Sequence, residues 1–173
     1  MYLFHFLSDK IVHQMKSDDL VLRKKVLVEI NEDFHQADKL NEALDSGILM
    51  CLVYCCREQD DVIRELASRA ILKIANTEKG RVTIVSSRSL AIVANLFDDN
   101  VCQIRHNAYT CLINLAQFVY GITSIIDADI LRVLVDKLVA EREDIILILI
   151  LKLMNILLEG DLATSLLLNT PVL

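Results

Sequence analysis

The chain of 173 residues lacks tryptophan, contains a single proline at position 171, and has four glycines. Aromatic residues make up only 5% of the chain, so its apolar content of 54% comes mainly from aliphatic side chains. Four dispersed glycines cannot build a glycine-rich phosphate-binding loop, and neither GxxxxGK[ST] nor GxGxxG occurs. So few helix breakers among so many aliphatic residues predict a helical protein with a substantial core.

The chain also has no excess of basic residues and no paired cysteine motif. Its net charge of −6 makes nucleic acid and anionic membranes poor candidate partners. Five cysteines without CxxC spacing are typical of reduced thiols inside a cell, and Cys51, Cys55 and Cys111 are predicted to lie in the core. Residues 1–7 have no basic region before their apolar stretch, so we expect no signal peptide and a cytoplasmic location.

Motifs for catalysis are absent as well, since neither HExxH nor GxSxG occurs. Cys102 and His106 are four residues apart, but no further histidine or cysteine follows at ligand spacing, so no metal site is expected. Three acidic pairs precede predicted helices, where carboxylates stabilise the positive end of the helix dipole: Asp18-Asp19, Asp60-Asp61 and Asp98-Asp99. We therefore expect no enzyme activity, no cofactor and no small-molecule substrate.

What the sequence does contain is an internal repeat of 41 to 42 residues. One anchor recurs at Arg23, Arg64 and Arg105, with Leu147 in the fourth position, and a second anchor recurs in step at Leu49, Leu90, Leu131 and Leu173. This period is typical of helical units that stack side by side. It predicts an all-α fold, an armadillo/HEAT-type right-handed α-solenoid with about three full repeats and partial end repeats.

The predicted units cover residues 18–58, 59–99, 100–141 and 142–173 of one solenoid domain, and residues 1–17 are expected to close a preceding partial repeat. In the second unit a long helix carries its apolar residues at helical spacing, followed by a short helix at 81–86 and a third from Leu90. Gly80 and Gly121 occupy the same position in consecutive units, and we expect each to free a sharp turn between helices. The pattern also predicts a piece of a longer repeat protein, or an end that docks on a partner.

Candidate binding residues follow from the repeat. Arg23, Arg64 and Arg105 are expected to pair with acids of the neighbouring unit as a structural ladder, or alternatively to form a basic ladder for an acidic partner. If the long helices line a concave groove, the sides opposite their apolar stripes present four polar residues to a partner: Arg69, Lys73, Thr110 and Asn114.

The apolar run 145–151 continues to Leu158, which is too short to span a bilayer. A buried helix is one reading of this run. Alternatively, Leu147 and Leu149 belong to an exposed patch that another protein covers.

The stretch 105–116 resembles the last helix of an armadillo repeat, which closes on Asn-Leu-Ala as at Asn114 here. In nuclear-import receptors and catenins this asparagine recurs and grips an extended peptide. This chain has it once, with Glu32, Lys73 and Ile156 at the corresponding positions.

A closer resemblance covers residues 9–173. The stretches 17–26, 120–128, 131–144 and 171–173 are similar to the radial spoke head armadillo-repeat family, also called the rhabdoid tumour deletion region protein family, in its N-terminal half. This resemblance implies a structural scaffold of the radial spoke in the axoneme of motile cilia and flagella, with other spoke proteins as partners. The alternative is a soluble cytoplasmic adaptor that binds a peptide or helix transiently in its groove.

Overall fold

The computed structural model describes residues 10–169, with side chains through residue 159, and within that range it contains helices and no strand. Residues 10–15 are helical and precede the labelled helices. These are α2 (Leu20–Asp33), α3 (Ala37–Asp45), α4 (Ile48–Cys55), α5 (Asp61–Ala75), α6 (Glu78–Ser86), α7 (Leu90–Asn95) with the 3₁₀ turn η1 (Leu96–Asp98), α8 (Cys102–Leu115), α9 (Val119–Asp127), α10 (Ile130–Ala140) and α11 (Asp144–Asn169).

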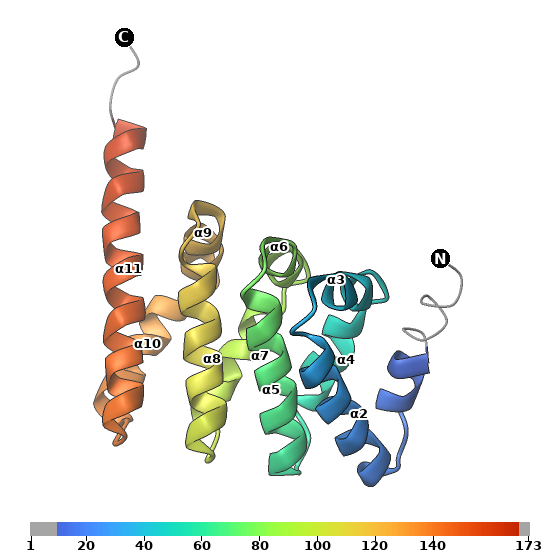
Figure 1. Cartoon of the computed structure of the whole chain (residues 1–173). Helices are drawn as coiled ribbons and strands as arrows, with labels where there is room; N and C mark the ends of the chain where they lie inside the picture. The colour runs from blue at the N-terminus through green and yellow to red at the C-terminus, as the bar shows by residue number, and fades with distance from the viewer. Residues whose placement is uncertain (1–9, 170–173) are drawn as a thin grey trace.

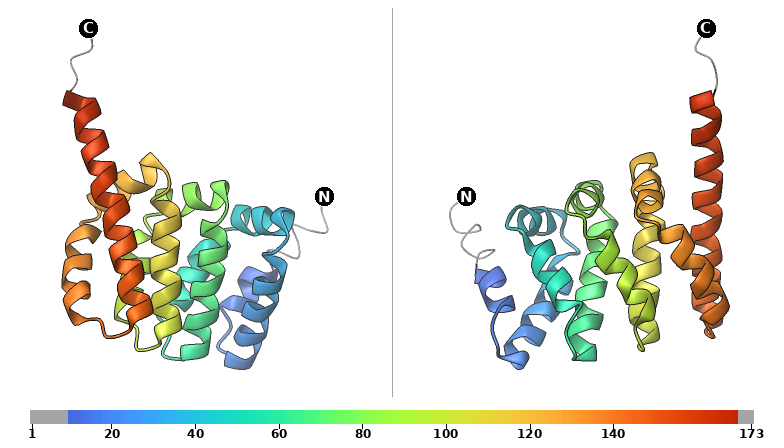
Figure 2. Two further views of the ribbon diagram at one scale, coloured as in Figure 1. Left: turned by 60° about the vertical axis from the view of Figure 1, so that its left-hand side comes forward. Right: turned by 180° about the vertical axis from the view of Figure 1, so that it is seen from behind.

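The helices stack as a solenoid. The long helices α2, α5, α8 and α11 stand side by side in chain order, with α3, α6 and α9 across one end of the row (Figure 1). Seen from behind, α4, α7 and α10 form a second layer (Figure 2). Each long helix contacts the next one along the chain, so the core runs the length of the stack. The predicted all-α solenoid is confirmed.

The core follows the predicted apolar stripes. The long helices of the second and third units, α5 and α8, each carry one apolar stripe, and every residue of these two stripes is buried. They are Ile63, Ala67, Ala70, Ile71 and Ile74 on α5 and Ile104, Ala108, Cys111, Leu112 and Leu115 on α8. Cys51 and Cys55 are buried as well, as predicted, and burial raises the pKa of the Cys55 thiol to about 11. These side chains recur at three and four residues because that spacing keeps them on one side of a helix.

Aspartates begin two of the long helices. Asp19 accepts hydrogen bonds from the backbone N–H groups of Val21 and Leu22, and Asp60 does the same at the start of α5. The third acidic pair is different, because the residue before α8 is Val101 and Asp99 faces Arg64 instead. The third pair does precede a helix, α8, but the predicted capping role was wrong for it.

The two repeated glycines lie inside helices rather than in turns. Gly80 is in the first turn of α6, which begins at Glu78 because Thr77 caps it, earlier than the predicted start at 81. A Cβ at Gly80 would lie 2.0 Å from the carbonyl oxygen of Ile74, and one at Gly121 would lie 1.9 Å from that of Leu115. The expected turn was wrong: these glycines allow a short helix to cross closely over the end of a long one.

Helix α11 is much longer than its equivalents. It has 26 residues, whereas α2 and α8 have 14 and α5 has 15. Its end projects beyond the row formed by the other long helices (Figure 1). Within the part of the chain that the structure describes, no helix has both the length and the apolarity that crossing a bilayer requires. The predicted anchor at Leu173 and the segment 1–9 lie outside the described residues.

Candidate functional site

Three arginines join the bases of consecutive long helices. Arg23 Nη1 lies 2.6 Å from Glu58 Oε1, and Arg105 Nε lies 2.9 Å from Glu141 Oε2. Arg64 makes the same kind of pair, with Nε 2.6 Å from Asp99 Oδ2. Each acid is 35 or 36 residues further along the chain, in the loop that leads to the next long helix. The acid is thus the last residue of the arginine's own predicted unit, so the prediction that it belongs to the neighbouring unit was wrong.

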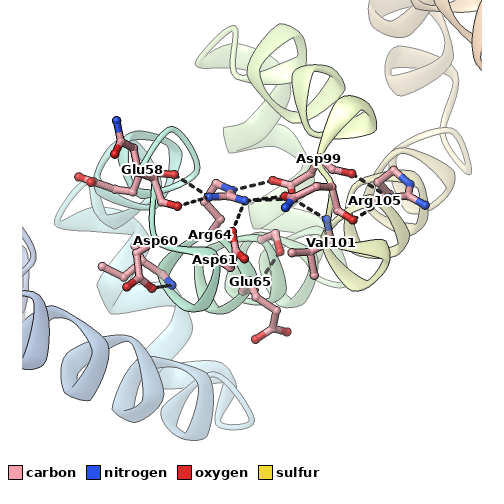
Figure 3. A network of polar contacts seen from close by, with 12 residues as sticks. Glu58, Asp60, Asp61, Arg64, Glu65, Asp99, Val101 and Arg105 are labelled. Carbon is pink, nitrogen blue, oxygen red and sulfur yellow. Dashed lines mark hydrogen bonds and ion pairs between the residues drawn. The ribbon is translucent and has the colours of Figure 1, made fainter.

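Arg64 and Arg105 also hold the loop that precedes their own helix. Arg64 Nη1 donates to the carbonyl oxygens of Glu58 and Gln59, at 2.9 and 2.8 Å, while Nη2 donates to Asp61 (Figure 3). Arg105 Nη1 donates to the carbonyl oxygen of Asp99 in the same manner. One guanidinium therefore ties two loops together, which its planar set of donors allows and a lysine would not reproduce.

The charges of this ladder stabilise one another. The hydrogen bond to Glu58 raises the pKa of Arg23, and the hydrogen bond to Asp99 raises the pKa of Arg64. Burial acts to raise the pKa of Glu141, but hydrogen bonds from the N–H groups of Glu143 and Arg142 and from Arg105 outweigh it, and the pKa falls below its usual value. In the fourth unit Leu147 stands where these arginines stand, so no cation is present there.

The four predicted polar residues lie on two adjacent long helices, Arg69 and Lys73 on α5 and Thr110 and Asn114 on α8. We call these four residues the long-helix face. Arg69 is exposed and the other three are partly buried. The repeat brings Arg69 into register with Thr110, and Lys73 into register with Asn114.

The polar groups of this face bind mostly to the protein itself. Lys73 Nζ donates to the backbone oxygen of Asn31 and lies 3.0 Å from His35 Nε2, so it connects α5 to the end of α2. Asn114 Nδ2 donates to Asn76 Oδ1 at 2.6 Å, which connects α8 to the end of α5. Burial, followed by the charge of Arg69, lowers the pKa of Lys73.

The other two residues of the face make fewer bonds between helices. Arg69 pairs with Glu65 one turn earlier on α5, with Nη2 2.6 Å from Oε1. Thr110 Oγ1 is buried and has no hydrogen-bond partner among the residues that the structure describes. The face is therefore a row of bonds between neighbouring units with one unsatisfied hydroxyl, rather than a set of free donors.

On α11 the structure brings Leu147 and Leu149 to half-buried positions, and Leu149 packs against the core. The exposed apolar residues of this helix are others: Ile145, Ile148, Leu151 and Leu158. Sequence reasoning missed these four because the run 145–151 is apolar on every side.

A cavity of about 410 Å³ lies at the opposite end of the solenoid, between residues 10–14, α2 and α3. Its lining is apolar at Val26 and Ile30 and charged at Lys25, Glu29 and Asp33. No group of three or more histidine, cysteine, aspartate or glutamate side chains gathers in the described residues as a metal site would require.

Solved structures share this arrangement of helices. A designed armadillo repeat protein matches 88% of this chain with a TM-score of 0.75 and 19% identity, and the match covers 70% of that protein. The fold is that of an armadillo-type solenoid. A second designed armadillo repeat protein, in complex with the peptide (KR)4, matches 88% of the chain with a TM-score of 0.76 and 19% identity, over 69% of its own length.

An engineered protein gives a TM-score of 0.78 at 19% identity over 88% of the chain. The chain spans 63% of that protein, 64% of a second engineered protein and 41% of a third. No protein-family model matches the sequence. Armadillo-type solenoids expose long continuous surfaces, which suits them to binding other proteins.

Proposed function

We propose that this protein is a non-enzymatic structural scaffold subunit of the radial spoke in the axoneme of motile cilia and flagella. It binds neighbouring spoke proteins through its solenoid surface. The scaffold part of the proposal rests on the armadillo-type fold and on an apolar face left open on α11. The radial spoke part rests on the resemblance of residues 17–26, 120–128 and 131–144 to the radial spoke head armadillo-repeat family.

The observation that carries the scaffold reading is the use of polar groups on the long-helix face. Lys73 donates to the end of α2, and Asn114 donates to the end of α5. The arginines of the ladder donate to neighbouring loops. A face that grips a peptide needs free donors aimed at the ligand. A solenoid whose donors are used internally, and whose apolar residues are exposed on its last helix, suits a stable interface with a folded protein.

The test is the behaviour of the tagged protein in motile ciliated cells. The chain is expected to sediment with axonemes after the membrane is removed, and to resist salt extraction together with spoke proteins. Static interfaces with apolar centres persist at high ionic strength, because screening weakens exposed charge pairs more than buried apolar contacts. A chain extracted as readily as a freely soluble protein contradicts the proposal.

The second candidate is a cytoplasmic adaptor that binds a peptide on the long-helix face. A designed relative of this fold is in complex with the peptide (KR)4, and Arg69, Lys73, Thr110 and Asn114 are the residues that would line such a site here. Because Arg69 and Lys73 are cationic, an acidic peptide suits this face better than (KR)4. Saturable binding of labelled acidic peptides, lost in Arg69→Glu, would favour the adaptor over the scaffold.

A further inference from the structure

The short helices that cross one end of the solenoid differ in how they begin. α3, α6 and α9 begin 41 residues apart, so their first residues are in register. In the first two units this start is polar or small, with Gln-Ala-Asp at 36–38 and Thr-Glu-Lys at 77–79. The third unit has Phe-Val-Tyr at 118–120, on the helix that lies beside α6 (Figure 1). The start of α9 is therefore an apolar exception to the repeat.

These apolar side chains lie at the surface. Val119 is 70% exposed, Tyr120 is 37% exposed and Phe118 is partly exposed. The positions in register with Val119 and Tyr120 are exposed in the first two units as well, although the next short helix is in place beside them. Exposure here therefore belongs to the repeat, and the third unit places apolar groups where the others place mostly charged ones.

Arg81 on α6 lies against the start of α9. Its Cζ atom lies 4.0 Å from the centroid of the Phe118 ring, and the rings of Phe118 and Tyr120 are stacked with their centroids 5.9 Å apart. Arg81 Nη1 donates to the backbone oxygen of Ala75 at 3.3 Å. We call Arg81, Phe118, Val119 and Tyr120 the α6–α9 cluster. Side chains already held by such contacts lose little freedom when a partner binds.

Arg81 is a cation at an apolar position of the repeat. The residues in register with it are Leu40, which is buried, and Ile122, which packs against the core. Arg81 is partly buried, its Nε is buried without a hydrogen-bond partner, and it forms no ion pair among the described residues, Glu78 one turn earlier included. Each arginine of the ladder, by contrast, pairs with a carboxylate. A cation that is partly buried without an acid is costly, so a carboxylate brought by a partner gains more here than at a fully hydrated arginine.

We propose that the α6–α9 cluster binds a segment of another protein in which an acidic side chain stands beside an aromatic or long aliphatic one. The carboxylate pairs with Arg81, whose Nη2 donates to no group among the described residues. The apolar side chain packs on Val119 and Tyr120. Aromatic residues and arginine are the types enriched in protein interfaces, and charge selects the partner because a basic or neutral segment leaves Arg81 unpaired.

This inference adds a place and a kind of partner to the proposed scaffold. It does not rest on the axonemal location, and it concerns the rim formed by the short helices rather than the long-helix face. The experiment uses the purified whole chain, so its failure leaves the sedimentation test with axonemes unaffected. Equally, a chain that is absent from axonemes can still bind the acidic segment.

The test is fluorescence anisotropy of the labelled peptide Glu-Phe-Glu-Leu, with both ends blocked so that its side chains carry the only carboxylates. Saturable binding to the wild-type chain is expected with a Kd of about 100 µM or tighter. The counterpart with glutamine in place of glutamate is expected to bind about tenfold more weakly, because it cannot form the charged pair.

Arg81→Ile separates binding from stability. Isoleucine already occupies this position at Ile122, so the free energy of unfolding should not fall, while the Kd for the acidic peptide should rise about tenfold. Arg132→Ile is the matched control, because Arg132 is exposed on α10, and it should bind as the wild type does. Circular dichroism checks that each variant keeps its helices.

The apolar half of the cluster has its own pair of variants. Tyr120→Ser should weaken binding about fivefold because apolar contact is lost, whereas Tyr54→Ser on α4, where Tyr54 is 62% exposed, should have no effect. Absence of saturable binding, equal affinity for the glutamine peptide, or an affinity unchanged in Arg81→Ile overturns the proposal. Binding that Arg69→Glu abolishes and Arg81→Ile retains assigns the peptide to the long-helix face instead and overturns it as well.

Discussion

Arg64 and Arg105 each connect two loops through one guanidinium. Arg64 reaches the carbonyl oxygens of Glu58 and Gln59 on one side and the carboxylate of Asp99 on the other. Both charged groups are largely buried, with side-chain exposures of 12% and 6%. A pair of this kind contributes little over two well-packed apolar residues, but losing one partner leaves the other charge buried alone.

Arg64→Met is therefore expected to lower the free energy of unfolding by about 2–4 kcal/mol, chiefly because Asp99 loses its partner. Denaturation in urea with circular dichroism measures the change. Arg132→Met is the control, since Arg132 is exposed on α10, and its effect should stay within about 0.5 kcal/mol. Equal effects of the two substitutions would mean that the ladder contributes nothing to stability.

Glu141 gives the ladder a dependence on pH. Its pKa lies below the ordinary value of 4.5, so the folded chain favours the ionised form more than the unfolded chain does. The resulting stabilisation is fully present above pH 4.5 and is lost as the pH falls through the lowered pKa of the folded state. In Glu141→Gln the loss of stability relative to wild type should be largest near neutral pH and should shrink in acid. A difference that stays constant from neutral pH into acid would contradict this assignment.

At the scale of helices, the crossing of short helices over long ones depends on glycine. Gly80 lies where the first turn of α6 meets the last carbonyl groups of α5, and Gly121 occupies the same crossing between α9 and α8. In the first unit Lys39 occupies this place and pairs with Asp33, so that crossing accommodates a side chain. The glycines thus set how closely two of the three units pack.

Gly80→Ala should cost about 2 kcal/mol of folding free energy, because the added methyl group would overlap the backbone of Ile74 and force α6 outward. The substitution is informative because alanine is otherwise the better helix former by about 1 kcal/mol. Thermal unfolding monitored by circular dichroism measures the loss, with Val82→Ala on the same helix as the exposed control. A more stable Gly80→Ala protein would show that α6 can shift at no cost.

The architecture follows from the sequence more readily than the crossings do. The stripes on α5 and α8 recur at helical spacing and the anchors recur at 41 residues, so local pattern predicts both the helices and their stacking. Gly80 was misread because a glycine in a turn and a glycine under a crossing helix look alike in sequence. Only the approach of Ile74 in three dimensions separates them.

Prediction from sequence has the same limit for surface residues. Lys73 and Asn114 look free in the sequence because their partners, Asn31 and Asn76, lie 38 or more residues away. On α11 an apolar run hides which side is exposed, since every position carries a similar side chain. A surface can be predicted from sequence where polar and apolar residues alternate, and not where one kind continues all the way around a helix.

At the scale of the whole molecule, bonds between side chains join neighbouring units. Asn107 bonds to Ser68 and Lys73 bonds to Asn31, and each pair connects two consecutive long helices. The stability of such a stack is close to the sum of its units and of the interfaces between neighbours. Local changes should therefore have local effects.

Leu27→Ala in α2 is expected to accelerate amide hydrogen exchange mainly in α2, α3 and α4, because a fully buried leucine is lost from the first unit. Leu112→Ala in α8 is the counterpart in a central unit and should loosen the helices on both of its sides. Exchange measured by mass spectrometry separates the two patterns. A uniform acceleration along the chain in both variants would show that the solenoid unfolds as a single cooperative body.

The ladder of arginines has a mechanical consequence. Each rung lies at the loops between two long helices, so a load applied at the two ends of the stack passes through every rung in turn, together with the packed helix surfaces beside it. Links arranged in series carry the same tension and their extensions add, so the softest link extends first. The link between α8 and α11 contains the last arginine rung, Arg105 with Glu141, and the α11 position in the arginine register is Leu147. We expect a protein built on this plan to extend elastically along its length while each helix stays rigid.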